Sequence, residues 1–334
     1  MTASILKSIL AIAFTFIFSL SAEAKIYYVK VNGTGQGNSW DDAAGEINAV
    51  LFAAKPGDQI WVAAGTYYPT VNNDRNETIA VPDKVKVFGG FTGVETAVEQ
   101  RNFEANVTVL SGEINTESPE DNSYNVVTFR RVTRSTELNG FTVRGGMGNG
   151  TGTTGDFTRC GGGIYNDGAG YIKGSNPTIA NCIFENNQSR DGGAVYNNGI
   201  AGRANPHFIN CIFSSNTADF DGGAVFNDGR KRGTANPTFA DCCFIFNKAN
   251  YGGGVLNYGA GGESSPKFRN CEFRANYAYK GDGAMYNLDA EGSSNPELSA
   301  CNFNGNVSRD DKVRSRVPNE EIITAGGREL MIKI

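Results

Sequence analysis

The sequence is poor in the features that mark several common protein classes. It has one histidine, no excess of positive charge and, after Leu20, no run of 18 or more apolar residues. The balance of 35 Asp and Glu against 30 Lys and Arg argues against nucleic acid or an anionic membrane surface as the main partner. The lack of a second long apolar run predicts that the mature chain has no transmembrane helix.

Helix-favouring residues are also sparse, whereas glycine is abundant, with 43 residues. This composition is typical of an all-β chain with many turns. Only residues 39–54 have helical periodicity, with apolar residues every three or four positions. We expect Ser39 or Asp41 to cap this single short helix and Pro56 to end it.

The first 24 residues have the pattern of an export signal. Lys7 supplies the positive start, Ile9–Leu20 is an apolar run too short to span a membrane, and residues 21–24 end in a small-x-small pattern. We therefore expect residues 1–24 to be a signal peptide. The protein would then be exported, and would be extracellular or located at the cell surface or outer membrane.

Residues 160–306 contain five repeats of about 30 residues. One phrase of the repeat reads GGGIYN, GGAVYN, GGAVFN, GGGVLN and DGAMYN, and a second reads NCIFENN, NCIFSSN, DCCFIFN, NCEFRAN and ACNFNGN. Each unit contains Gly and Pro and lacks helical periodicity, and it is too short for a propeller blade. The repeat therefore predicts a parallel β-helix, a solenoid with one turn per repeat and two or three short strands per turn.

Fixed positions of the repeat predict columns of identical side chains. We expect the asparagines to form asparagine ladders at corners with left-handed backbone, and the Gly-Gly pairs to form corners closed to bulkier residues. Five cysteines share one repeat position and are expected to be buried free thiols, because stacked strands hold them too far apart for disulfides. They are Cys182, Cys211, Cys242, Cys271 and Cys301.

Residues 25–306 are thus predicted to form a single domain, with N-terminal coils and a cap at 25–159 followed by the five repeats at 160–306. Residues 307–334 lie beyond the last repeat and end in the apolar run Leu-Met-Ile-Lys-Ile. They either cap the last turn, whose strand edges are otherwise open, or are disordered.

The phrases GGAVYN and NPxFxNCxFxxN resemble the repeats of polymorphic outer-membrane proteins and related bacterial surface proteins of the pectin-lyase-like superfamily. Stretches such as AAKPGDQIWVAAGTYYPT and VFGGFTGVETAVEQR resemble the opening of the same secreted proteins. The resemblance covers residues 26–306. It implies a right-handed coil whose N-terminal end is closed by the helix near residues 41–54.

The superfamily includes polysaccharide lyases and galacturonan hydrolases, so a catalytic role must be weighed. The hydrolases would need a Gly-His-Gly turn, but His207, the one histidine, lies in Asn-Pro-His-Phe at a variable surface position. A lyase would need acidic ligands for Ca²⁺. Asp191 and Asp221 occupy equivalent repeat positions and are weak candidates for a shared cation, although solvated loop acids are the simpler interpretation. No catalytic residue is assigned, and no cofactor is expected beyond a possible Ca²⁺.

Another column holds rings, at Tyr165, Tyr196, Phe226 and Tyr286. We expect the neighbouring Ile and Val column to face the core and the rings to be partly exposed, as a surface for stacking on sugars or a protein partner. The sequence thus favours a non-catalytic adhesin-like, structural or glycan-binding role with an extracellular glycan or surface protein as partner. The alternative is a carbohydrate-active enzyme, such as a lyase on acidic polysaccharide.

Overall fold

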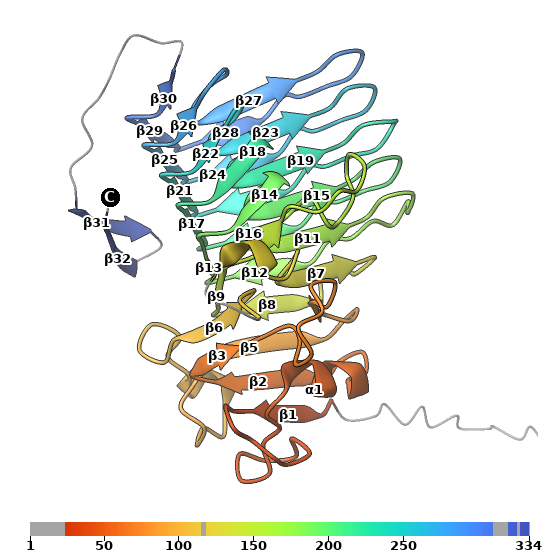
Figure 1. The fold of residues 1–334 in the computed structure, drawn as a ribbon, viewed down its shortest axis with the longest axis vertical. Coiled ribbons are helices and arrows are strands. Elements are labelled where there is room, and N and C mark those ends of the chain that lie inside the picture. Colours follow the sequence, from red (N-terminus) through yellow and green to blue (C-terminus); the bar gives the residue numbers. More distant parts are fainter. Residues whose placement is uncertain (1–23, 115–117, 310–319, 326–327, 334) are drawn as a thin grey trace, which may run out of the picture.

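The computed structural model describes residues 24–114, 118–309, 320–325 and 328–333, and most of this chain winds into a parallel β-helix of about nine turns (Figure 1). This confirms the predicted all-β solenoid. Within the described residues, no helix is long and apolar enough to cross a membrane. The signal peptide predicted at residues 1–24 lies, apart from Ala24, outside the described residues.

Four parallel sheets, which we name A to D, run along the β-helix. Sheet A contains β1 (Ile26–Val29), β2 (Gln59–Ala63), β5 (Lys86–Phe91), β8 (Glu137–Asn139), β12 (Thr178–Ala180), β16 (His207–Ile209), β20 (Thr238–Ala240), β24 (Lys267–Arg269) and β28 (Glu297–Ser299). Sheet B contains β3 (Gly65–Tyr67), β6 (Thr108–Ser111), β9 (Thr142–Arg144), β13 (Ile183–Glu185), β17 (Ile212–Ser214), β21 (Cys243–Ile245), β25 (Glu272–Arg274) and β29 (Asn302–Asn304).

Sheet C contains β4 (Ile79–Ala80), β7 (Val127–Arg130), β11 (Ile164–Asp167), β15 (Val195–Asn198), β19 (Val225–Asp228), β23 (Val255–Tyr258) and β27 (Met285–Leu288). Sheet D contains β10 (Met147–Gly148), β14 (Gln188–Asp191), β18 (Thr217–Asp221), β22 (Lys248–Ala249), β26 (Tyr277–Ala278) and β30 (Val307–Ser308). Each repeat makes one turn, in the order C, A, B, D. A turn therefore has four strands rather than the two or three expected, because the sequence pattern does not reveal the short strands of sheet D.

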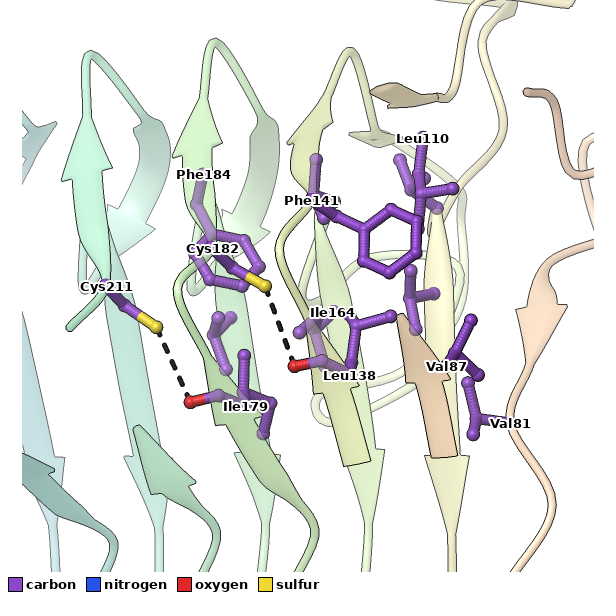
Figure 2. Packing of buried hydrophobic residues seen from close by; sticks show 14 of the residues in the cluster. Val81, Val87, Leu110, Leu138, Phe141, Ile164, Ile179, Cys182, Phe184 and Cys211 are labelled. Carbon is purple, nitrogen blue, oxygen red and sulfur yellow. Dashed lines mark hydrogen bonds between the residues drawn. The ribbon is translucent and has the colours of Figure 1, made fainter. Parts of the chain in front are cut away.

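Identical side chains stack from turn to turn inside the β-helix, because equivalent repeat positions pair in the strand register. Phe184 pairs with Phe213, and their rings stack with centroids 5.0 Å apart. The cysteine column lies beside these rings (Figure 2), and the Cys182 thiol donates to the carbonyl of Leu138 at 3.7 Å. All seven cysteines are free, and only Cys301 is partly exposed, which confirms the prediction of buried thiols for the other four members of the column.

Two asparagine ladders run along the β-helix, as predicted. In the first, Asn166 Nδ2 donates to Asn197 Oδ1 at 3.2 Å, and the pattern continues through Asn227, Asn257 and Asn287. The second comprises Asn187, Asn216, Asn247, Asn276 and Asn306. Neither ladder has the left-handed backbone that we expected of it. That conformation belongs to other columns. One lies at the corner between sheets A and B and contains Asn181, Asn210, Asp241, Asn270 and Ala300, and another lies at the corner between sheets B and D and contains Asn186, Ser215, Phe246, Ala275 and Gly305.

The Gly-Gly corner needs glycine for two different reasons. The first glycine is left-handed, with φ of 65° at Gly192 and 66° at Gly222. The second has no room for a side chain, because a Cβ on Gly193 would lie 2.2 Å from the carbonyl oxygen of Gly223. The prediction that bulkier residues cannot form this corner is therefore supported by both backbone and space.

The N-terminal turn carries helix α1 (Ile47–Ala53), which buries Ile47, Val50 and Leu51. The expected cap at Ser39 or Asp41 is wrong: Glu46 precedes the helix and its side chain makes no capping hydrogen bond. The Ser39 hydroxyl instead accepts from the Asp42 amide in a preceding turn. Two short 3₁₀ helices, η1 (Val98–Gln100) and η2 (Pro119–Asp121), lie in later loops.

Beyond residue 306, β30 joins sheet D and two longer strands follow it. They are β31 (Glu320–Ala325) and β32 (Arg328–Lys333), and they pair with each other antiparallel. The alternatives of a cap or a disordered tail for residues 307–334 remain predictions.

Candidate functional site

The outer face of sheet C is where the structure differs most from the sequence-based expectation. Along β11, Ile164 and Asn166 point into the β-helix, so Tyr165 and Asp167 point outward. The inward column is buried, as predicted, and Ile164, Val195, Val225 and Val255 are its fully buried members.

The outward rings do not form an exposed ladder. Tyr165 is 8% exposed, Tyr196 0% and Phe226 3%, so the expectation of partly exposed rings is wrong for these three residues. Only Tyr286, in the last described turn of sheet C, is partly exposed. The rings stack on one another, with centroids 5.8 Å apart for Tyr165 and Tyr196. They form a second apolar cluster outside the β-helix.

A segment outside the repeat covers the first rings of this cluster. Residues 149–159 lie between β10 and β11, and the Tyr165 hydroxyl donates to the carbonyl of Gly155 at 2.7 Å. The Asn198 side chain donates to the same hydroxyl at 2.7 Å. The later repeats lack an equivalent insertion in the sequence. That extra length was the available signal that the first rings would be covered.

A buried charge network holds the second ring. The Tyr196 hydroxyl donates to Asp228 Oδ2, and Arg230 binds the same carboxylate through Nε and Nη2. Burial raises the pKa of the Tyr196 hydroxyl well above its usual range, so this group stays a donor. The hydrogen bond to Asp228 raises the pKa of Arg230, whose guanidinium lies over the Tyr258 ring at 4.7 Å. The network neutralises the Asp228 charge.

A cavity of about 190 Å³ opens beside Tyr165. Its lining combines aromatic and charged side chains: Phe157 from the covering segment is 39% exposed, and Arg130 Nε lies 3.5 Å from Asp167 Oδ2. The complete lining is Thr128, Phe129, Arg130, Phe157, Tyr165 and Asp167. Of these residues, the sequence pointed only to Tyr165. Arg130 precedes the repeats, and Asp167 follows the phrase GGGIYN at a position that varies between repeats. The repeat pattern therefore does not point to either residue.

The two candidate cation ligands lie on neighbouring turns of the β-helix. Asp191 and Asp221 are register partners in sheet D, as predicted. Asp191 is buried, forms an ion pair with Arg190 and accepts from the Cys160 thiol at 3.9 Å. Burial raises the pKa of Asp191 to about 7 and that of Asp221 to about 6, so both carboxyl groups keep their protons to a higher pH than an exposed aspartate does. Among the described residues, no three His, Cys, Asp or Glu side chains are grouped to bind a metal ion.

His207 is half-buried rather than freely exposed. Its Nδ1 lies 2.6 Å from the Thr238 hydroxyl, on the outer side of sheet A, and burial lowers its pKa. The hydrogen-bond partner of this ring is thus a hydroxyl rather than a carboxylate, in keeping with a structural role.

Comparison with known proteins identifies the repeat. The family model described as the Chlamydia polymorphic membrane protein repeat matches residues 181–198 and 210–228. The crystal structure of pectate lyase Pel9A is similar to this chain at 13% sequence identity and a TM-score of 0.40, covering 84% of this chain and 78% of that chain. No curated protein matches the sequence. The chain is a parallel β-helix protein that carries repeats of the polymorphic membrane protein type.

Proposed function

We propose that this protein is an exported, surface-associated β-helix that binds a saccharide without turning it over. The observation that carries the proposal is the cavity beside Tyr165, which combines the half-exposed Phe157 ring with the charged pair Arg130 and Asp167. Ligand sites in proteins are typically concave, mostly apolar and furnished with a few polar groups that fix orientation.

The chemistry of the lining suits a sugar. A sugar ring has an apolar C–H face that packs on an aromatic ring, and a rim of hydroxyl groups. The carboxylate of Asp167 accepts hydrogen bonds from hydroxyl groups and the guanidinium of Arg130 donates to them. Because Arg130 and Asp167 come from neighbouring strands, β7 and β11, their spacing is set by the strand register rather than by a mobile loop.

Export is supported by the signal-like residues 1–24, and a surface location by the match to a membrane protein repeat. An adhesin-like role would use the cavity to hold a glycan of another cell or of the surrounding matrix. A structural role would use it to hold a glycan of the cell's own surface.

The proposal is tested by screening the mature protein on a glycan array and measuring the affinity of any hit by calorimetry. We expect Phe157→Ala to weaken binding by about tenfold or more, because the aromatic packing surface is lost. Phe52→Ala is the matched control, since Phe52 is 96% exposed on α1 and does not line the cavity. Equal affinity of the Phe157→Ala protein and the wild type would contradict the proposal.

Catalysis is tested in parallel by incubating the protein with uronate polymers, with and without Ca²⁺, and following the ultraviolet absorbance of unsaturated products. Release of such products would overturn the non-catalytic assignment and favour a polysaccharide lyase.

A further inference from the structure

A strip of basic side chains lies on the loops that follow the strands of sheet C. Figure 1 shows these loops as a row of projections along one side of the β-helix, after β11, β15, β19, β23 and β27. The strip begins in β7 and covers four successive turns. Its members, which we call the basic loop strip, are all exposed: Arg130, Arg131, Lys173, Arg203, Lys231 and Arg232.

The backbone fixes the spacing of these charges. The loops are joined by hydrogen bonds from Gly170 N to Ile200 O at 2.9 Å, from Ala201 N to Arg230 O at 3.0 Å and from Arg232 N to Gly261 O at 2.6 Å. Neighbouring turns are therefore held at the strand separation of about 4.8 Å, and the strip spans roughly 14 Å between its first and last turns. An ordered row of charges of this kind needs little rearrangement to meet a polymer.

Acidic side chains offset little of the charge of the strip: among the described residues, Arg130 is its one member with an ion pair, to Asp167. The carboxylate of Asp228 is buried and occupied by Arg230, and Asp167 is half-buried beside Arg130. Further along the row the sign of the charge reverses, because the next two loops carry Glu263, Asp289 and Glu291. The strip is thus a bounded basic surface on a chain whose net charge is −5.

We propose that the basic loop strip binds an anionic polysaccharide, with carboxylate or sulfate groups that meet successive turns. The assignment deepens the saccharide-binding function proposed above and rests on it, since Arg130 belongs both to the strip and to the cavity beside Phe157. Four of the six charges are arginines, whose planar guanidinium groups bind oxyanions through two parallel hydrogen bonds. A polymer that places one sugar in the cavity would extend along the loops.

A polysaccharide fits this surface better than a single-stranded nucleic acid does. Proteins that bind single strands offer rings on which successive bases stack. Along the strip, the ring of Tyr171 is instead covered by the Arg131 guanidinium, at 5.2 Å. The row therefore presents charge rather than stacking surfaces.

The test measures binding of the mature protein to three polymers: heparin, which carries sulfate; polygalacturonate, which carries carboxylate; and dextran, which is neutral. We expect heparin or polygalacturonate to bind and dextran not to bind along the strip, with affinity falling as salt is raised. The double variant Lys231→Gln/Arg232→Gln should lose about tenfold or more in affinity. The two polyanions together identify which anionic group is recognised.

The matched control is Lys55→Gln/Lys280→Gln, which removes the same charge from two exposed lysines outside the strip. Equal loss in both double variants, or no binding of either polyanion, would overturn the proposal. Single-stranded DNA binding as tightly as the better polyanion would also overturn it, in favour of a nucleic-acid partner. If Phe157→Ala abolishes binding of a neutral sugar while the Lys231→Gln/Arg232→Gln protein binds every ligand as the wild type does, the proposed function stands and the basic loop strip does not.

Discussion

The hydroxyl of Tyr196 on one turn of the β-helix donates a hydrogen bond to the buried carboxylate of Asp228 on the next turn. The ring column that contains Tyr196 is thus a second core, held by polar contacts at its outer edge. This explains why these rings are closed to ligands, whereas the cavity at the end of the column is open.

Replacing Tyr196 by Phe should destabilise the protein without changing its fold. The ring packing is kept, but Asp228 loses one of its donors, and a hydrogen bond to a charged group contributes about 1.5–3 kcal/mol. We expect a loss of this order in the free energy of unfolding by urea. Tyr286→Phe, at the partly exposed end of the same column, is the control and should change stability little. A Tyr196→Phe protein as stable as the wild type would show that Asp228 is satisfied by Arg230 alone.

The free energy of unfolding should fall as the pH rises, because of the raised pKa values of Asp191 and Asp221. Burial raises the pKa of Asp191 to about 7 and that of Asp221 to about 6, against about 3.9 in an unfolded chain. The folded protein therefore keeps protons that the unfolded chain releases. Their stabilising contribution is complete below about pH 4 and is lost as the pH rises to about 7.

The measurement is thermal unfolding at about pH 5 and about pH 8 for the wild type and Asp191→Asn. The variant should have a smaller drop in melting temperature between the two conditions and a higher melting temperature at the upper pH. His207, whose pKa is lowered, acts in the opposite direction over this range but is common to both proteins. Asp219→Asn, at an exposed neighbouring site, is the control. Parallel pH profiles for the wild type and Asp191→Asn would contradict the assignment.

The fold was predictable because each repeat places the same residue types at the same positions of a turn. Phe184 stacks on Phe213, and Phe213 stacks on Phe244, independently of the loops between them. The core columns, the asparagine ladders and the number of turns in the repeat region therefore follow from periodicity. The prediction was weaker where one residue type has two roles. The repeat pattern suggests left-handed backbone and ladder bonds for the same asparagines. Asn181 has both properties, whereas Asn187 has the ladder bond without the left-handed backbone.

The candidate site was less predictable because it depends on segments that occur once in the sequence, outside the repeats. Period alone places Tyr196 on the outer side of sheet C but does not say whether anything lies over it. The covering residues 149–159 occur once, and the Arg130–Asp167 pair joins the last turn before the repeats to the first repeat. Contacts of this kind have no periodic signal. They are set by the length and path of individual loops.

Gly223→Ala should be among the most destabilising single changes in the chain. A Cβ on Gly223 would lie 2.2 Å from the carbonyl oxygen of Gly253, and neither backbone can move without disturbing the turns on both sides. We expect a loss of at least about 3 kcal/mol or failure to fold. Gly170→Ala is the informative comparison, because Gly170 is left-handed but a Cβ there would meet no atom within 4 Å. It should cost only about 1–2 kcal/mol from backbone strain, and equal effects of the two changes would show that crowding is not decisive at the corner.

The number of cysteine thiols that react quickly with a reagent should rise when the protein unfolds. The seven thiols are free, six of them are buried, and Cys301 is partly exposed. A thiol reagent should therefore label one group quickly in the native protein and all seven after denaturation without reductant, because buried thiols react only when the chain opens. Cys301→Ser should remove the fast phase and leave the slow one unchanged, since its side chain lies at the end of the column. Fewer than six reactive groups in the denatured Cys301→Ser protein would show that two of the stacked cysteines are joined by a disulfide.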